Sequence, residues 1–474
     1  MTSPEAILSS GNGLIVAPAG CGKTQLIVET LKLSPPKPFL VLTHTTAGVA
    51  ALQARLKKER VPRQNYQLTT IAGWVISTVL KFPGTTGVTR ENLNNPDYTT
   101  LHNAAAILIG SGHIDRILRA TYSRLLVDEY QDCTNSQHNL VAQLSRLLPT
   151  TVFGDPMQAI FNFGDDPLPC WSNVVQSHFP LIGEVNTPWR WNNAGCPDLG
   201  NWLLSAREIL GSGRAIDIST GGPNINWVQL TGNPASDQEI QIEHQYQINN
   251  QTPNDESILI VGDARRPQNR HGFAQRTRGV GVVERVDMID LKGFFEAFQN
   301  EDKAMLISQA LNTASLVMSG VGKAALQKRI ATIVAGRSKK ESSPIEIAAA
   351  NAATTGDAES FLHLFKEFEH AEGTRIFRHA ALAVIKDSLL LSKTTKTPPI
   401  DAFIRIIEKR RHSGEKKIPT KAIGSTLLLK GLEADHVVIL NANCDSMNAQ
   451  NLYVALTRGA RSVTILASNP HIGL

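Results

Sequence analysis

The sequence predicts an α/β protein with two cores, each built on a parallel sheet. Short apolar runs rich in β-branched residues alternate with helix-like segments, which is the pattern of buried parallel strands. One set of runs lies before residue 154 and a second set after residue 226, so two separate α/β cores are expected. The predicted strands are 14–16, 39–42, 125–127, 151–153, 227–230, 258–261, 437–440 and 463–466.

Each predicted core is interrupted by an insertion. Pro83, Gly84 and Gly87, together with a turn-rich stretch that follows them, indicate a small insertion. A later segment is alanine-rich and helix-favouring with no strand-like run, which indicates a larger helical insertion. The predicted division is 1–78 and 121–190 for the first core, 79–120 for the small insertion, 191–292 and 401–474 for the second core, and 293–400 for the helical insertion.

The composition excludes several classes of protein. With 474 residues, 42% of them hydrophobic and 19% charged, the chain is expected to fold into several units rather than stay disordered. No apolar run is long enough to span a membrane and no secretory signal is visible, so a cytoplasmic location is expected. The five scattered cysteines contain no C-x-x-C pair, which argues against a structural zinc site. The net charge of +5 suits a polyanionic partner and many ordinary enzymes alike.

Residues 14–24 have the sequence of a strand, a glycine-rich turn and a helix start. A phosphate site needs converging backbone N–H groups, a lysine for the β- and γ-phosphates and a hydroxyl for magnesium. Lys23 and Thr24 supply the side chains, although Ala17 replaces the first glycine of the general P-loop pattern. The alternative is an accidental turn, which the strand–turn–helix context disfavours. The predicted ATP-binding residues of this loop are Gly20, Cys21, Gly22, Lys23, Thr24 and Gln25.

Two further strand ends carry residues suited to phosphoryl transfer. Asp128, together with Thr24, can hold Mg²⁺, while Glu129 can polarise the attacking water. Gln158 follows the next predicted strand, and its neutral amide can sense the γ-phosphate. Taken alone, the acidic pair would be a solvated strand end and Gln158 a turn residue. Downstream of a P-loop, both are better explained as parts of an ATP site.

The order of these motifs resembles the UvrD/Rep/PcrA-like branch of superfamily-one helicases. The resemblance implies two RecA-like P-loop NTPase domains with ATP bound between them. It also implies ATP-driven movement on single-stranded or forked DNA in the 3′-to-5′ direction. The segments that carry it are A-P-A-G-C-G-K-T at 17–24, D-E-Y-Q-D at 128–132, G-D-P-M-Q-A-I-F at 154–161, P-W-R-W at 188–191, K-G-L-E at 430–433 and Y-V-A-L-T-R-G-A at 453–460.

The resemblance also implies roles for residues near the second core. Arg190 and Arg458 would reach the γ-phosphate, Trp189 would stack on the base in place of the family's tyrosine, and Glu433 would approach the ribose. An arginine from a neighbouring domain contributes about 10³ to 10⁵ in rate in related phosphoryl-transfer systems. Isolated arginines are more often surface ion pairs, so these two assignments depend on their motifs. If they are correct, hydrolysis depends on closure of the two domains.

The resemblance places single-stranded DNA across the tops of both cores. Hydroxyl groups and backbone amides suit phosphate contacts, and aromatic faces accept any base by stacking, for about 1 to 3 kcal/mol each. Two aromatics at i and i+2 would otherwise be strand core residues. Basic clusters at 57–58, 265–266 and 409–411 are more typical of solvated faces. The predicted DNA-binding residues are Thr43, His44, Thr45, Thr69, Thr70, Phe161 and Phe163.

Three departures from the family pattern affect these expectations. No glutamine precedes Gln25, so the residue that reads adenine in the family is absent, and use of dATP and GTP beside ATP is expected. Leu427 stands where the family has a histidine, and the segment at 163–165 replaces the family's W-R-G. Both changes lie in segments that are expected to couple DNA binding to nucleotide hydrolysis. ATP hydrolysis is therefore predicted more firmly than processive unwinding.

Two hypotheses of different classes follow. The first is a helicase or translocase that moves on DNA. The second is a subunit in which ATP hydrolysis reports DNA ends and activates a partner nuclease. The compact size resembles the UvrD-like helicase subunit of Gabija-type anti-phage systems, whose partner is an OLD/TOPRIM-type nuclease. A P-loop enzyme acting on small molecules would leave Arg190, Arg458 and Gln158 unexplained.

Overall fold

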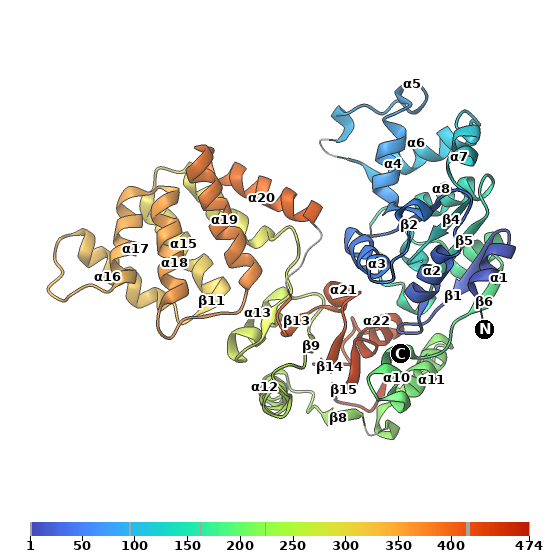
Figure 1. Ribbon diagram of the computed structural model, residues 1–474. Helices are drawn as coiled ribbons and strands as arrows, with labels where there is room; N and C mark the ends of the chain where they lie inside the picture. Colours follow the sequence, from blue (N-terminus) through green and yellow to red (C-terminus); the bar gives the residue numbers. More distant parts are fainter. Residues whose placement is uncertain (1, 94–95, 162–163, 223, 414–417, 474) are drawn as a thin grey trace.

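Two six-stranded parallel sheets form the framework of the protein. A computed structural model describes residues 2–93, 96–161, 164–222, 224–413 and 418–473. Figure 1 shows the two sheets on one side of the molecule and a group of helices on the other. The predicted α/β fold with two parallel sheets and a helical insertion is therefore confirmed. We call each sheet, with the helices packed on it, a lobe.

The first sheet has the strand order β3-β2-β4-β5-β1-β6. Four of its strands coincide with predicted ones to within two residues at either end. The sequence analysis missed β3 and β6, which lie at the two edges and are partly exposed, so they lack the continuous apolar run of a central strand. The strands are β1 Gly13–Val16, β2 Phe39–Thr43, β3 Tyr66–Thr70, β4 Arg124–Val127, β5 Thr150–Gly154 and β6 Leu181–Glu184.

Helices cover both faces of the first sheet because alternate strand residues point to opposite sides. Leu14 and Leu125 belong to one buried cluster, with side chains of α4, α6 and α8. Ile15 and Leu126 belong to the other, with side chains of α2 and α3. The helices of this lobe are α1 Pro4–Ser9, α2 Lys23–Lys32, α3 Thr46–Lys58, α4 Ile71–Val79, α5 Pro83–Thr86, α6 Tyr98–Gly110, α7 Asp115–Thr121, α8 Asn135–Ser145 and α9 Gln176–His178.

The second sheet has the strand order β10-β13-β9-β14-β15-β8. Its four predicted strands coincide with observed ones, whereas the two-residue β10 was missed and β13 was only indicated near residue 423. A separate antiparallel pair joins β7 Ile216–Asp217 to β16 His471–Ile472. The strands of the sheet are β8 Ile225–Gln229, β9 Ile258–Val261, β10 Gly281–Val282, β13 Lys421–Gly424, β14 Ala434–Ile439 and β15 Gly459–Ala467.

Two helices of the second lobe, α10 and α11, precede its first strand in the sequence. The predicted core boundary after residue 190 falls inside α10, so we propose that the second unit begins at residue 189. Among the described residues, no helix is both long and apolar enough to cross a bilayer. The helices are α10 Trp189–Asn193, α11 Pro197–Gly211, α12 Pro234–Gln251, α13 Pro267–Arg276, α21 Thr426–Leu429 and α22 Ala449–Leu456.

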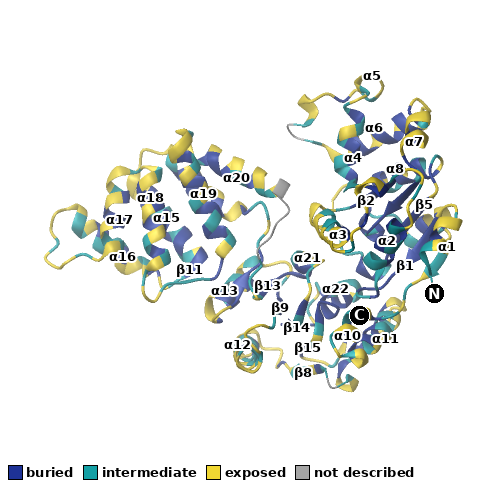
Figure 2. Ribbon diagram, in the orientation of Figure 1, coloured by how far each residue is buried: buried dark blue, intermediate teal, exposed yellow. Residues whose placement is uncertain are grey.

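The helical insertion lies between the neighbouring strands β10 and β13 and has its own buried cluster, which includes Phe294, Phe361 and Phe365. Figure 2 shows this buried interior as separate from those of the sheets. The expectation of no strand was wrong, because β11 Met318–Ser319 pairs with β12 Arg375–Ile376. A two-residue pair has no alternating pattern to detect. The helices are α14 Lys292–Glu296, α15 Lys303–Val317, α16 Lys323–Val334, α17 Pro344–Thr355, α18 Ala358–His370, α19 His379–Thr395 and α20 Pro399–Ser413.

Arg378 joins the helical insertion to the second sheet. It precedes α19 and is 1% exposed, and its guanidinium donates two hydrogen bonds, of 2.6 and 2.9 Å, to the carboxylate of Glu284 just after β10. A third bond, of 2.6 Å, reaches Asp290. Because the Glu284 side chain is only 7% exposed, loss of Arg378 would leave its carboxylate largely shielded from water and without this partner.

We predict that Arg378→Met destabilises the protein by about 3 to 5 kcal/mol, because it leaves a buried carboxylate without a partner. Urea unfolding followed by circular dichroism measures the loss. Lys292→Met, which breaks an exposed pair with Glu296, is the control and should change the free energy of unfolding by less than about 1 kcal/mol. Equal effects of the two substitutions would contradict the assigned role of Arg378.

Candidate functional site

The loop between β1 and α2 has the geometry of an anion site. Gly20 and Gly22 adopt positive φ angles of 69° and 94°, which other residues rarely tolerate. Among the described residues, no side chain makes a capping hydrogen bond to the start of α2, which begins at Lys23. Since helix N-termini and such glycine turns attract phosphate groups, the loop fits a nucleotide triphosphate.

Lys23 and the two carboxylates after β4 form a charged cluster in which Asp128 is buried and Glu129 is partly exposed. The Lys23 Nζ atom lies 2.5 Å from Glu129 Oε1 and 3.1 Å from Asp128 Oδ1. Burial alone would lower the pKa of Lys23, but the charges of the two carboxylates have the larger effect and raise this pKa. Burial raises the pKa of Asp128, whereas for Glu129 the charge of Lys23 overcomes burial and lowers the pKa to about 2. Glu129 is therefore ionised at neutral pH, as a base must be.

Gln131 connects this cluster to the end of the neighbouring strand β5. Its amide donates a hydrogen bond of 2.5 Å to Glu129 Oε2 and accepts one of 3.2 Å from the Asp155 N–H. Asp155 is fully buried and accepts from Gln158 Nε2 at 3.0 Å. The predicted base and the predicted phosphate sensor are thus held in one hydrogen-bonded chain.

Asp155 also accepts hydrogen bonds from an arginine that the sequence analysis did not identify. Arg207 of α11 donates bonds of 3.0 and 2.7 Å to Asp155 Oδ1, and so links the second lobe to β5 of the first. Arg207 lies in no motif, and only its position in the folded structure reveals the contact.

The predicted arginines lie together in the second lobe. Arg190 donates 2.5 Å to the Thr457 carbonyl and pairs with Glu433. Arg458 is 3% exposed and donates to the carbonyls of Val454 and Leu432. Burial, reinforced by Arg190, lowers the pKa of Arg458 to about 10, while the charge of Glu433 acts most strongly in the opposite direction. The printed hydrogen bonds of the Arg458 guanidinium, including one to the Thr457 hydroxyl, lie within the second lobe.

Two tryptophans of α10 lie against the P-loop. A Cβ added at Gly22 would come within 3.0 Å of Trp189, and one at Gly20 within 2.7 Å of the Trp191 ring. Trp189 is 52% exposed, so its ring is available for stacking beside the loop, as predicted for a base contact. Trp191 is buried, and its ring N–H donates 2.8 Å to the Gly459 carbonyl. The sequence analysis assigned Trp191 no role.

The remaining predicted ATP-binding residues of the loop differ in what they can contact. Thr24 occupies the second position of α2, where its hydroxyl can face a metal bound at the loop. Gln25 donates 2.6 Å to Glu29, one turn along the helix. Cys21 is buried and its N–H donates to the Pro18 carbonyl. Burial raises the pKa of its thiol to about 12, so Cys21 is neutral.

The predicted DNA-binding threonines lie at the ends of the adjacent strands β2 and β3, where Thr43 pairs with Thr70 and Leu42 with Thr69, and Thr45 follows β2. Two of the hydroxyls cap helices: Thr45 accepts from Gly48 N–H and Thr70 from Gly73 N–H. Those two oxygens therefore also have a local structural role. The hydroxyl of Thr43 is buried without a hydrogen-bond partner.

The aromatic part of the predicted DNA track also lies at this edge of the first lobe. The ring of Phe161 lies 5.7 Å from that of His44. Burial lowers the pKa of His44, and the charge of Lys430 lowers it further, so the imidazole is neutral. The predicted contact Phe163 lies outside the described residues.

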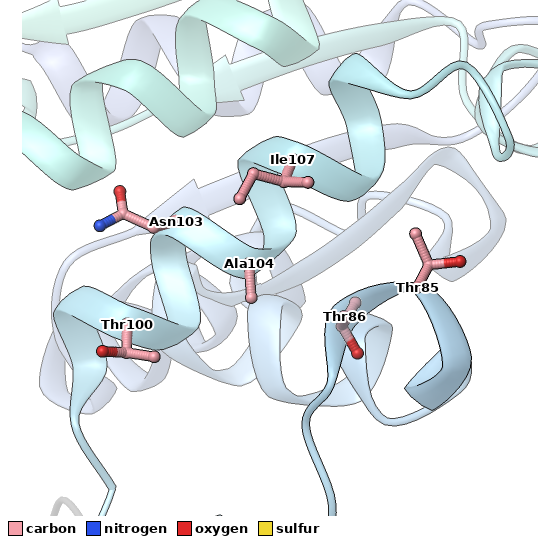
Figure 3. Close-up of a pocket in the computed structure, with 6 residues that line it drawn as sticks. All are labelled: Thr85, Thr86, Thr100, Asn103, Ala104 and Ile107. Carbon is pink, nitrogen blue, oxygen red and sulfur yellow. The ribbon is translucent and has the colours of Figure 1, made fainter.

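A separate hollow lies between α5 and α6 of the first lobe (Figure 3). It contains no residue of the predicted site and no titratable side chain, so we assign it no role. Its lining residues are Thr85, Thr86, Thr100, Asn103, Ala104 and Ile107.

Asp132 supplies a pH-dependent contribution to stability. Burial raises its pKa to about 7 in spite of the nearby Lys430. The folded state therefore binds this proton more tightly than the unfolded chain, whose aspartate titrates near about 3.9, and stability is lost as the pH rises through this range. We predict that the melting temperature of Asp132→Asn rises relative to wild type between about pH 5 and about pH 8.

Thermal unfolding at a series of pH values measures this difference. Asp445→Asn removes an exposed carboxylate and is the control. A difference between Asp132→Asn and wild type that stays constant over the whole range would show that the Asp132 pKa is not raised.

One family model matches part of the chain. Residues 90–166 match the UvrD/REP helicase N-terminal domain, and no curated protein sequence matches the chain. Among solved structures, the complex of an arterivirus nonstructural protein 10 (helicase) with DNA is similar with a TM-score of 0.35 and 8% identity. The similarity covers 98% of this chain and 62% of that one, so the chain spans less than two thirds of its length. The family match contains Asp128, Glu129 and Gln158 and relates this part of the first lobe to UvrD-like helicases.

Proposed function

We propose that the protein is a DNA-dependent ATPase of the UvrD-like helicase type, which couples ATP hydrolysis to movement on single-stranded DNA. The observation that carries this proposal is the arrangement of charges between the lobes. Lys23, Asp128 and Glu129 come from the first lobe, while Arg190 and Arg458 come from the second. The family match across β4 and β5 supports it.

ATP and Mg²⁺ are the expected cofactors, and the residues present fit them. The glycine turn and the start of α2 would hold the phosphates, with Lys23 as the cation. The Thr24 hydroxyl and the Asp128 carboxylate would hold the metal, which supplies neutralisation of phosphate charge when bound. Trp189 would stack on the base and Glu433 would contact the ribose.

In this proposal, each of the following polar side chains has a specific role in ATP hydrolysis. Glu129, kept ionised by Lys23 and oriented by Gln131, accepts the proton of the attacking water. Gln158, fixed by Asp155, presents its amide to the γ-phosphate position. Arg190 and Arg458 stabilise the charge that develops on the transferred phosphoryl group. Because these arginines belong to the second lobe, turnover depends on how closely the lobes approach.

Single-stranded DNA would cross the edge where β2 and β3 end. We propose phosphate contacts at Thr43, His44, Thr45, Thr69 and Thr70, and base stacking at Phe161. Phe163 remains part of this proposal on sequence grounds. These contacts read no base edge, so binding would be independent of sequence.

Narrower proposals rest on the sequence resemblance alone. We propose 3′-to-5′ movement, a role in anti-phage defence or DNA repair, and turnover of dATP and GTP beside ATP. The second candidate function, a DNA-end sensor that activates an OLD/TOPRIM-type nuclease, is favoured by Leu427 at a position where the family has a histidine. Stable co-purification with such a nuclease would favour the sensor.

The proposed function is tested by ATP turnover with and without single-stranded DNA, followed by strand displacement on a forked duplex. We expect DNA to stimulate turnover, and Lys23→Ala to abolish it. Stimulation without displacement would favour the sensor over the motor. Turnover that DNA does not change would overturn both.

We predict that Glu129→Gln lowers kcat by about 10²- to 10⁴-fold, because the amide cannot accept a proton from water. Nucleotide binding should persist, since Lys23 and the loop are unchanged. Steady-state turnover and binding of a fluorescent ADP analogue measure the two effects, with the exposed Glu91→Gln as the control. A Glu129→Gln variant that retains more than about a tenth of the wild-type kcat would exclude Glu129 as the base.

A further inference from the structure

The backbone of Glu129, the proposed base, has an unusual conformation. Its φ and ψ angles are 55° and 43°, in the left-handed region that residues with a Cβ rarely adopt. Such a conformation persists only where the surrounding structure holds it. The next residue, Tyr130, begins the short helical turn Tyr130–Asp132 and is 1% exposed. Tyr130 is thus placed to hold the Glu129 backbone.

The Tyr130 side chain is fixed by a hydrogen bond and by ring contacts. Its hydroxyl oxygen lies 2.8 Å from Nδ1 of His138 in α8. Its ring meets that of Phe179 edge to face, with centres 5.5 Å apart, and that of His138 at 6.1 Å. Burial, with a smaller contribution from His178, lowers the pKa of His138 to about 4. At neutral pH the imidazole is therefore uncharged and can accept a hydrogen bond from the phenol.

This hydrogen bond lies on the opposite face of the first sheet from α2. Tyr130 and Phe179 belong to the buried cluster that includes side chains of α4, α6 and α8, whereas α2 contributes to the cluster on the other face. A triphosphate at the start of α2 would engage Lys23, which in this structure pairs with Glu129. The bond between Tyr130 and His138 would persist, because it lies outside the phosphate loop.

We propose that Tyr130 and His138 form a positioning pair for the proposed base Glu129. The inference rests on the proposed function, in which Glu129 accepts the proton of the attacking water. With Lys23 engaged by the triphosphate, the Glu129 carboxylate keeps its bond from Gln131 and depends on its backbone for direction. The Tyr130 side chain anchors that backbone, and a displacement of about 1 Å at a reacting group can cost about 10² in rate.

A tyrosine that only fills the core would behave differently. Loss of its hydroxyl would lower the melting temperature, but each folded molecule would still hydrolyse ATP at the wild-type rate. A positioning residue instead changes kcat in the folded protein and leaves nucleotide binding unchanged. It also acts only through Glu129, so its effect disappears once the carboxylate is removed.

The first test measures kcat and KM for ATP with an oligo(dT) strand present, and binding of a fluorescent ADP analogue counts the folded sites. We expect Tyr130→Phe, which keeps the ring, to lower kcat per site about tenfold and to change KM by less than about twofold. His138→Leu should have the same effect, whereas His138→Asn, which retains an acceptor near the Nδ1 position, should keep most of the rate.

Tyr122→Phe is the matched control. It removes the hydroxyl of another buried tyrosine in the same lobe, which donates a hydrogen bond of 2.7 Å to Gln67. Its kcat per site should stay within about twofold of the wild-type value, because neither residue contacts the segment that carries Glu129 in the proposed mechanism.

The second test repeats Tyr130→Phe in the Glu129→Gln background. Because the hydroxyl acts through the carboxylate, the double variant should be no slower than Glu129→Gln alone. A further fall of about tenfold in that background, or a wild-type kcat per site for Tyr130→Phe alone, would overturn the inference and leave the proposed function intact. A wild-type kcat for Glu129→Gln would overturn the assignment of the base, and the inference with it.

Discussion

The packing of α10 against the P-loop is the contact on which the candidate site depends. Trp191 lies over Gly20 and is bonded to the Gly459 carbonyl, so it joins the P-loop to the residue after Arg458. The Arg190 backbone N–H donates to the Gly20 carbonyl, so the start of the Arg190 side chain lies beside the same loop. Ala19 and Met157 of the first lobe share a buried cluster with Trp191 and α11. These apolar contacts bring together charges that neither sheet could assemble alone.

Around this apolar interface between the lobes, several charged residues form ion pairs. Lys23 is paired with two carboxylates, Arg207 with Asp155 and Lys430 with Asp132. Buried charges are costly without partners, so this pairing lets the candidate site fold with its charged groups in place. A triphosphate would compete with those partners for Lys23 and the arginines. Under the proposed function, nucleotide binding and the contacts between the lobes would therefore involve the same charges.

Local sequence patterns predict the centre of each sheet and the phosphate loop. Leu125 to Val127 is a buried β-branched and apolar run, and the strand–glycine–helix order around Lys23 is readable without tertiary information. The edge strands β3 and β6 were not predicted from the sequence because their residues are half exposed and partly polar. Contacts such as Lys430 with Asp132, which lie 298 residues apart, depend on how the lobes meet and leave no local signal. Both residues belong to sequence motifs, but only the folded arrangement shows that they are in contact.

The central claim, that two lobes share one catalytic site, is tested most directly by the kcat of Arg458→Ala. The account predicts a fall of about 10³- to 10⁵-fold, because the guanidinium comes from the opposite lobe and acts on the charge of the transferred phosphoryl group. ADP binding should change little, since Lys23 and the glycine turn remain. A folded Arg458→Ala protein that hydrolyses ATP at the wild-type rate would contradict the account.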